Sequence, residues 1–247
     1  MRYYMIYAIS GLKRTGKDTA SKFIQELTGA VPYALAHPIK KSIHNGLQRI
    51  QKTKDISFAD VNGETEYDRE QDLGLTTLEL KSLLNNAIMF CHRHNNFTFG
   101  EMHKLFNSVS EFRSSDKMTI KDMLCIGFAE FFGNKKKAAE IENKYKWSIR
   151  RLMQVLGTDL VVNVRRDYWL ECIPDDGKDI IITDVRQAHE MQFCRDNGAK
   201  VIFICKTGIV STDSHITERG LEPSASDIIV FNDGTLEALK KNIKSIV

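Results

Sequence analysis

The residues GLKRTGKDT at positions 11–19 determine how the rest of the chain is interpreted. They follow an apolar run, Tyr4–Ile9, and precede residues 20–27, where apolar side chains recur at helical spacing. Glycines at both ends let the backbone turn sharply, so that successive N–H groups point inward at phosphate oxygens. The helix that follows directs the positive end of its dipole to the same place, and a lysine adds a mobile positive charge. This order of strand, loop and helix predicts a phosphate-binding loop.

The loop departs from the usual pattern G-x-x-x-x-G-K-[ST] at one position. Asp18 occupies the Ser/Thr position and Thr19 follows one place later, so Thr19 is the residue expected to contact phosphate or Mg²⁺, directly or through water. A charged surface turn would explain Gly11 and Gly16, but it leaves the Lys-Asp-Thr sequence at a helix start unexplained. The residues predicted to contact nucleotide phosphates are Gly11, Lys13, Arg14, Thr15, Gly16, Lys17, Asp18 and Thr19.

The composition is that of an ordinary globular protein. A length of 247 residues suits one large α/β domain or two small ones, with 42% hydrophobic and 27% charged residues. The sequence has no apolar run of about 18 residues, so a membrane partner is not expected. Its first residues favour a strand over a signal peptide. A net charge of +3, dispersed along the chain, argues against a nucleic-acid partner. Five widely spaced cysteines among apolar neighbours indicate a reducing compartment, which predicts a cytoplasmic location.

Residues 51–146 differ in pattern from the chain on either side. Strand patterns disappear and polar loops separate helical patterns, which predicts a helical insertion between two parts of an α/β core, residues 1–50 and 147–247. Thr76–Glu79 has the sequence of a capping box at a helix start. A second helix is expected from about Thr119. The side chains expected on its inward face are Ile120, Met123, Leu124, Phe128 and Phe131.

A sharper helical pattern begins at Trp147, and its polar residues are informative. Arg150, Gln154 and Thr158 recur at i, i+4 and i+8, with Arg151 beside them and Gly157 allowing close approach at the helix end. Guanidinium groups bind phosphate in bidentate fashion and amides recognise hydrogen-bonding edges, so this stripe suits a ligand with both a phosphate and a base. The alternative is a solvated outer face with Arg151 in a surface ion pair.

Two further segments are expected at the carboxyl edge of a parallel sheet, where open α/β folds bind ligands. A short strand at residues 31–36 leads into a helix start at His37-Pro38, which brings Pro38, Ile39 and Lys40 to this edge. An apolar run at residues 179–183 ends at Asp184, a Walker-B-like carboxylate able to organise Mg²⁺ through water or to orient an acceptor.

Three other polar features each have two interpretations. Arg69 either pairs with its acidic neighbours or reaches a phosphate. Arg186 and Glu190, one helical turn apart, either pair with each other or face the same cleft as Asp184. The segment 206–227 has no regular period and is either a mobile lid or a surface loop.

Several short segments that occur along the chain in a fixed order identify a protein family more specifically than the phosphate loop alone. They are Gly16–Thr19, Leu35–Lys40, Tyr67–Glu70, Trp147–Gln154, Leu156–Asp159, Asp184–Gln187, His215–Glu218 and Asn232–Gly234. In these segments, and over nearly its whole length, the chain resembles the deoxynucleoside monophosphate kinases of T-even-like tailed bacteriophages.

The resemblance implies an α/β P-loop kinase fold of three layers, with a mostly parallel central sheet and the helical insertion on the acceptor side. It implies ATP as donor, Mg²⁺, and small-molecule partners that are deoxynucleoside 5′-monophosphates, converted to diphosphates. Lys17, Arg14 and Asp184 become the predicted catalytic residues. A homodimer is left open, and a phage-encoded protein would act in the host cytoplasm. The predicted acceptor-binding residues are Pro38, Ile39, Lys40, Arg69, Arg150, Arg151, Gln154, Gly157, Thr158, Trp169, Asp184, Arg186 and Glu190.

The resemblance has limits and leaves alternatives. The chain has His37 where a smaller residue is expected, the middle insertion matches least, and Trp169 could equally be a core residue. A dephospho-coenzyme-A kinase-like enzyme would instead transfer phosphate to a ribose hydroxyl, with Asp18 or Asp184 as the base. A regulatory module that binds nucleotide and hydrolyses ATP slowly or not at all is the alternative outside the kinases.

Overall fold

The computed structural model describes residues 4–209 and 221–247, and the chain divides into two compact units. The first unit comprises residues 1–36 and 169–247, and the second comprises residues 37–168. The predicted lid, 206–227, falls in part outside the described residues, and the motif His215–Glu218 falls entirely outside them.

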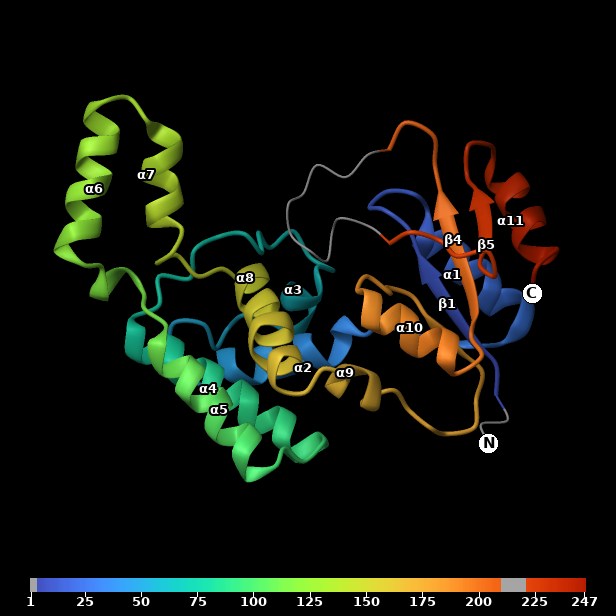
Figure 1. Ribbon diagram of the computed structural model, residues 1–247, viewed down its shortest axis with the longest axis horizontal. Helices are drawn as coiled ribbons and strands as arrows, with labels where there is room; N and C mark the ends of the chain where they lie inside the picture. Colours follow the sequence, from blue (N-terminus) through green and yellow to red (C-terminus); the bar gives the residue numbers. More distant parts are fainter. Residues whose placement is uncertain (1–3, 210–220) are drawn as a thin grey trace. The chain divides into compact units, whose positions relative to one another are not determined.

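Figure 1 shows the helices and strands and labels most of them. The strands are β1 (Ile6–Ser10), β2 (Val31–Tyr33), β3 (Ile180–Ile182), β4 (Lys200–Cys205) and β5 (Ile228–Phe231). The α-helices are α1 (Lys17–Thr28), α2 (Ala36–Leu47), α3 (Phe58–Asn62), α4 (Thr77–His94), α5 (Phe99–Glu111), α6 (Ile120–Phe131), α7 (Lys135–Glu142), α8 (Ile149–Gln154), α9 (Tyr168–Glu171), α10 (Ala188–Asp196) and α11 (Leu236–Lys244). A short 3₁₀ helix, η1 (Ser115–Lys117), and a π-helix, η2 (Val155–Val162), complete the list.

The first unit is built on a five-stranded sheet of order β2-β3-β1-β4-β5 within the described residues, and every pairing is parallel. Strand β1 lies at the centre, with Ala8 opposite Ile182 of β3 and Val201 of β4. All five residues of β1 are buried, as expected for a central parallel strand whose first four residues are apolar or aromatic. The prediction of an α/β fold with a mostly parallel central sheet is therefore confirmed.

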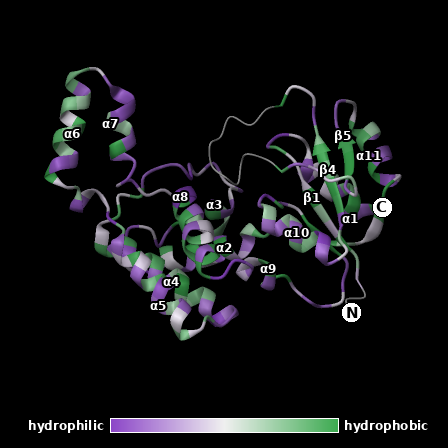
Figure 2. Ribbon diagram, in the orientation of Figure 1, coloured by the Kyte–Doolittle hydropathy of each residue, from purple (hydrophilic) through white to green (hydrophobic). Residues whose placement is uncertain are grey.

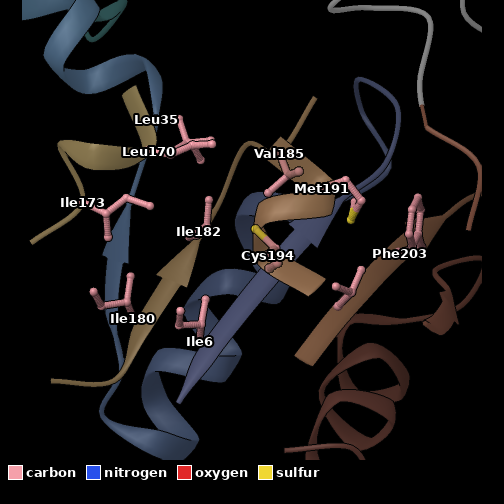
Figure 3. Packing of buried hydrophobic residues seen from close by; sticks show 12 residues of the cluster. Ile6, Leu35, Leu170, Ile173, Ile180, Ile182, Val185, Met191, Cys194 and Phe203 are labelled. Atoms are coloured by element: carbon pink, nitrogen blue, oxygen red, sulfur yellow. The ribbon is translucent and has the colours of Figure 1, made fainter. Parts of the chain in front are cut away.

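Helices cover both faces of the sheet and make three layers. On one face, α9 and α10 contribute Leu170, Met191 and Cys194 to a core that includes Ile182 of β3 and Phe203 of β4 (Figure 3). On the other face, α1 and α11 pack against the alternate side chains of the same strands. The buried residues of that second core are Tyr7, Ile9, Ala20, Ile24, Ala30, Ile181, Ile202, Ile204, Val230, Leu239 and Ile243. The carboxyl ends of all five parallel strands therefore meet at one open edge of the sheet, which is where the phosphate loop lies.

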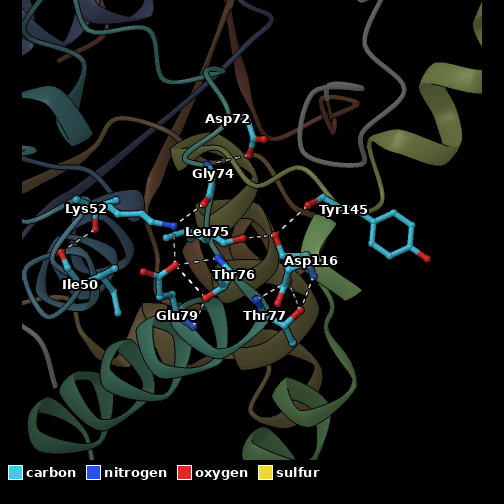
Figure 4. Close-up of polar contacts among 12 residues, drawn as sticks. Ile50, Lys52, Asp72, Gly74, Leu75, Thr76, Thr77, Glu79, Asp116 and Tyr145 are labelled. Atoms are coloured by element: carbon cyan, nitrogen blue, oxygen red, sulfur yellow. Dashed lines mark hydrogen bonds and ion pairs between the residues drawn. The ribbon is translucent and has the colours of Figure 1, made fainter. Parts of the chain in front are cut away.

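In the second unit, the capping box predicted at Thr76–Glu79 is confirmed at the start of α4 (Figure 4). The Thr76 amide donates to the Glu79 carboxylate at 2.8 Å, and the Glu79 amide donates back to the Thr76 hydroxyl at 3.3 Å. Lys52 contacts the same carboxylate at 3.0 Å. Local hydrogen bonds of this kind are readable in sequence because their partners lie three residues apart.

The helix expected near Thr119 is present as α6, but the prediction that its apolar side chains point inward is wrong. Ile120 is 77% exposed and Phe131 is 83% exposed, and Met123, Leu124 and Phe128 are also mostly exposed. The hydrophobic segments of α6 are visible in Figure 2. Within the described chain α6 packs mainly on the short, lysine-rich helix α7, which is too small to cover these apolar side chains.

The helix from Trp147 also differs from expectation. Only Ile149–Gln154 is α-helical, and Val155–Val162 continues as a π-helix. In a π-helix the hydrogen bonds run from i to i+5, so Thr158 does not follow Gln154 on the stripe expected from α-helical spacing. Such π-helical turns often occur at functional sites.

The compact units do not coincide with the predicted division at residues 50 and 147. The structure groups residues 37–50 and 147–168 with the helical unit, in part because η2 packs on α4 and α5. The division into a kinase core and an insertion describes the architecture of a family, and it stays a prediction. Among the described residues, no helix has the length and apolar character needed to cross a membrane.

Candidate active site

The predicted phosphate loop connects β1 to α1 and uses two glycine conformations that other residues rarely adopt. Gly16 is the N-cap of α1 in the left-handed region, at φ 99° and ψ 21°. Gly11 has φ 144°, and a Cβ there would lie 2.3 Å from the carbonyl oxygen of Ile204 in β4. Both positions therefore require glycine, and the loop backbone runs close against its neighbours.

Side chains within the first unit hold the loop in shape. Lys17 Nζ donates to the carbonyl of Leu12 at 2.8 Å, and Thr15 Oγ1 donates to the same carbonyl at 2.9 Å. Asn232, which follows β5, donates from Nδ2 to the carbonyl of Thr15 at 2.9 Å. Lys17 thus lies across the loop, at the end of α1 where a phosphate would be bound.

Asp184 follows β3 at the carboxyl edge of the sheet, as predicted, and both its oxygens contact backbone amides. Oδ1 accepts from the Leu35 amide at 2.7 Å, and Oδ2 accepts from the Ala36 amide at 3.3 Å. Asp184 therefore fixes the strand-to-helix connection that leads into Pro38, Ile39 and Lys40. Each oxygen keeps a second lone pair, so a contact to an acceptor or a metal-bound water is compatible with this arrangement.

Glu190 is almost fully buried, and its carboxyl group binds backbone amides close to the charges of Arg186 and Asp184. Glu190 Oε2 accepts from the backbone amides of Arg186 at 2.8 Å and Gln187 at 2.9 Å, forming a capping box at the start of α10. Burial raises the pKa of Glu190 to about 7, and the nearby charge of Asp184 adds to the shift, while the two amides oppose it. The carboxyl group fixes the backbone that presents Arg186, whose side chain is exposed.

This raised pKa predicts a pH-dependent stability. Between about pH 4.5 and 7 the native carboxyl of Glu190 keeps its proton while the unfolded one loses it, so the free energy of unfolding falls as the pH rises through this range. We expect the free energy of unfolding of the wild type to decrease by up to about 3 kcal/mol between pH 5 and 7.5 because of this group. In Glu190→Gln this decrease should be absent. Urea unfolding of both proteins at several pH values measures it.

Glu79 provides a matched control for this prediction. It holds the same position in the capping box of α4, but the hydrogen bond from the Thr76 amide holds its pKa below the usual value. Its stabilising effect is therefore present above pH 4.5 and lost as the pH falls. Glu79→Gln should alter only the acidic end of the profile. Equal pH profiles for wild type and Glu190→Gln would contradict the assignment.

In the second unit the structure brings Arg69 and Arg150 together, although they are far apart in sequence. The Arg150 amide donates to the carbonyl of Arg69 at 3.1 Å, and Arg150 Nε lies 3.3 Å from Glu70 Oε1. The guanidinium of Arg69 lies against the backbone of Gly63 and donates to the carbonyl of Val61 at 3.4 Å. Glu70, the acidic neighbour of Arg69, thus pairs with Arg150, while Arg69 contacts a backbone carbonyl.

Two contacts join Ile39 and Lys40 to the same unit. Gly157 in η2 has no room for a side chain, because a Cβ there would lie 2.8 Å from Ile39 Cδ1. Lys40 Nζ donates to Asn62 Oδ1, the last residue of α3, at 2.7 Å. The close approach expected at Gly157 is therefore made by Ile39.

The unexpected His37 packs edge-on against Phe58 of α3, with the ring centroids 5.6 Å apart. Burial lowers the pKa of His37, and Lys41 and Lys40 lower it further, so the ring is neutral at physiological pH. A neutral aromatic packing partner explains how this chain accommodates the larger residue.

The structure gives two other predicted residues local packing roles. Arg151 donates to the backbone carbonyls of Asn143, Lys144 and Lys146, and its guanidinium carbon lies 4.1 Å from the ring centre of Trp147. Its partners are carbonyls rather than the ion pair considered. Trp169 in the first unit is 4% exposed, as a core residue would be. Gln154 and Thr158 are half-buried.

Three residues that contact the phosphate loop or the two cations were not predicted as site residues, although Asn232 belongs to one of the matched segments. Asn232 holds the phosphate loop, and Asn62 and Gly63 contact Lys40 and Arg69. Asn232 had a usable signal, since it follows the last strand at the ligand-binding edge of the sheet. Asn62 and Gly63 had none, because α3 is only five residues long.

A loop of this geometry, placed between the first strand and first helix of a parallel sheet, defines the class of phosphate-binding-loop proteins. The family model described as "Deoxynucleotide monophosphate kinase" matches residues 5–243. The deoxynucleotide monophosphate kinase of Enterobacteria phage T4 is 35% identical over 96% of this chain and 96% of its own length. That of Escherichia phage RB69 is 34% identical over 97% of this chain and 98% of its own length. The chain belongs to the deoxynucleotide monophosphate kinase family.

Proposed function

We propose that the protein transfers the γ-phosphoryl group of ATP to the 5′-phosphate of deoxynucleoside monophosphates, giving ADP and deoxynucleoside diphosphates. The observation that carries this proposal is the Gly11–Thr19 loop at the carboxyl end of β1 in a chain that matches a kinase family almost from end to end. The alternatives, transfer to a ribose hydroxyl and a non-catalytic nucleotide-binding module, are not favoured by this match.

The loop binds the donor. Backbone amides of residues 11–19 and the start of α1 surround the ATP phosphates, and Lys17 exchanges its contact with the Leu12 carbonyl for phosphate oxygens. Arg14, with φ 67° in the loop, adds a second positive charge. These charges offset the negative charge that spreads over the transferring group in a loose transition state.

Four positively charged side chains bind the acceptor in this proposal. Arg69, Arg150, Lys40 and Arg186 contact its phosphate, while Asp184 fixes the connection that leads to Lys40. An oxygen of the acceptor phosphate attacks the γ-phosphorus in line, and the bond from that phosphorus to the bridging oxygen of ATP breaks. The acceptor phosphate is already an anion near neutral pH, so neither a general base nor a covalent enzyme intermediate is needed.

Mg²⁺ fits the residues that surround the loop. Within the described part of the chain, no group of three or more His, Cys, Asp or Glu side chains is arranged as a metal cage. Mg²⁺ in kinases is held mainly by nucleotide phosphates, waters and one or two protein oxygens, so the Thr19 hydroxyl, early in α1, suffices as a ligand. When bound with ATP, the ion neutralises charge on the phosphates.

An acceptor panel tests the proposal. ADP release is followed with a coupled assay in the presence of ATP and, in turn, each deoxynucleoside monophosphate, dephospho-coenzyme A and no acceptor. We expect turnover that depends on a deoxynucleoside monophosphate. Turnover with dephospho-coenzyme A alone, or equal ADP release without acceptor, would contradict it.

We also propose that the protein acts in the cytoplasm, on small-molecule nucleotides rather than nucleic acid.

We further propose that it forms a homodimer through α6. Five large apolar side chains of α6 are exposed, and together they amount to roughly 600–900 Å². That area is close to the ~800 Å² per partner of a stable interface.

Phe131→Glu should therefore convert a dimer to a monomer, because it places a charge in the apolar interface. Sedimentation velocity at a series of protein concentrations measures this, because the dimer fraction depends on concentration. Phe99→Glu is the control, since Phe99 is 88% exposed on another helix, α5, and its replacement should leave the dimer intact. A wild-type protein that is monomeric over the whole range would refute the dimer.

A further inference from the structure

The short helix α3 is fixed at both ends by hydrogen bonds. At its start, the side chain of Ser57 accepts from the Asp60 amide, and the Asp60 carboxylate accepts from the Ser57 amide at 2.8 Å. At its end, Gly63 adopts the left-handed region, at φ 80° and ψ 35°, and its amide donates to Ala59 at 2.9 Å. Val61 between them is fully buried. The helix is therefore a rigid support despite its length.

Two predicted acceptor-binding cations lie at the end of this support. The Arg69 guanidinium lies directly over Gly63, where a Cβ would come within 2.7 Å of Cζ, 2.9 Å of Nη2 and 3.0 Å of Nη1. Arg69 Nη1 also donates to the Val61 carbonyl. Lys40 Nζ donates to Asn62 at 2.7 Å. Three consecutive residues, 61–63, thus contact both cations.

We propose that Gly63 is a positioning residue for the acceptor phosphate: its missing side chain creates the space in which the Arg69 guanidinium lies in the orientation that binds phosphate. The inference rests on the proposed function, since it assumes that Arg69 binds the acceptor. A planar guanidinium makes two parallel hydrogen bonds to a phosphate only in a narrow range of orientations. A methyl group at Gly63 would push it out of its present position, because the crowded atoms are those of the guanidinium itself.

Gly29 provides a matched control. It is also the left-handed C-cap of a helix, α1, with φ 75°, and a Cβ there meets no atom of the described residues within 4 Å. Gly63→Ala and Gly29→Ala therefore introduce the same kind of backbone strain, but only Gly63→Ala displaces a guanidinium. Any loss common to both comes from the strained cap.

The test compares Gly63→Ala, Gly29→Ala, Arg69→Ala and the double variant Gly63→Ala/Arg69→Ala. Steady-state kinetics give KM for the deoxynucleoside monophosphate at saturating ATP and KM for ATP at saturating acceptor, and urea midpoints report the fold. We expect Gly63→Ala to raise the acceptor KM about 10-fold, with the ATP KM changed less than about 2-fold. Gly29→Ala should leave both KM values near wild type. The double variant should match Arg69→Ala, because the displaced group is already absent.

The outcomes separate the inference from the function on which it rests. An acceptor KM for Gly63→Ala equal to that of Gly29→Ala, or effects that add in the double variant, would overturn the role of Gly63. An unchanged acceptor KM in Arg69→Ala would instead remove Arg69 from the proposed acceptor site. If Gly63→Ala does not fold, Gly63→Asn replaces it, since asparagine tolerates the left-handed region while still placing a Cβ against Arg69.

Discussion

Replacing Lys17 with alanine is expected to lower kcat/KM for phosphoryl transfer by about 10²–10³, while the fold is retained. Lys17 is the loop side chain that reaches across to the Leu12 carbonyl, and α1 begins at Lys17 itself. Its ammonium group is expected to contact the transferring phosphate, where negative charge accumulates most in the transition state. Removing it deletes an interaction that is stronger in the transition state than in the ground state, so the loss should appear mainly in kcat.

The control for this variant is Lys22→Ala. Lys22 is an exposed lysine of the same helix, and its replacement removes the same charge at a position remote from the loop. Its kcat/KM should stay within about 2-fold of the wild type, because an exposed, distant charge contributes little. Near-normal turnover in Lys17→Ala, with an unchanged urea midpoint, would remove the loop from the proposed mechanism.

Replacing Gly11 with alanine is expected to damage both the fold and donor binding. A Cβ at this position would lie 2.3 Å from the Ile204 carbonyl oxygen and 3.0 Å from Thr15 Oγ1. The first of these atoms belongs to the backbone of β4, which pairs with β1, so the clash is relieved only by moving a central strand or the loop. We expect the free energy of unfolding to fall by about 2–4 kcal/mol. A displacement of the loop by about 1 Å should lower kcat/KM for ATP by about 10².

Gly198→Ala separates these effects from the general cost of a left-handed alanine. Gly198 has φ 69°, and the described atoms leave the space around its Cβ empty to 4 Å. Its replacement should cost about 1 kcal/mol of stability and leave ATP kinetics unchanged. If Gly11→Ala and Gly198→Ala behave alike in both unfolding and kinetics, the close packing of the loop against β4 does not matter to function.

The parts of the fold that sequence predicts well are those with local causes. Unbroken apolar runs at β1 and β3 identified the buried parallel strands, and the capping box at Thr76 identified the start of α4. Glycines and a lysine within nine residues predicted the phosphate loop. In each case the interacting groups lie a few residues apart, so their spacing carries the information.

The features that escaped prediction depend on contacts between distant residues. Periodicity places the apolar side chains of α6 on a helix, but whether they are covered depends on what packs there. The π-helix after Gln154 and the packing of Arg151 on Trp147 likewise depend on the surrounding helices. The capping of α10 by Glu190 depends on the backbone conformation at residues 186 and 187, which sequence spacing does not reveal. The acceptor roles of these residues stay predictions, and the kinetic variants described above address them.

The central claim, that the γ-phosphoryl group of ATP passes to a deoxynucleoside 5′-monophosphate, is tested most directly by following that group. The protein is incubated with ATP labelled at the γ-phosphorus, Mg²⁺ and an unlabelled deoxynucleoside monophosphate, and the products are separated by ion-exchange chromatography. We predict that the label appears in the β-phosphate of the deoxynucleoside diphosphate, in amounts equal to the ADP formed. Label recovered as inorganic phosphate, at a rate independent of the monophosphate, would contradict the account.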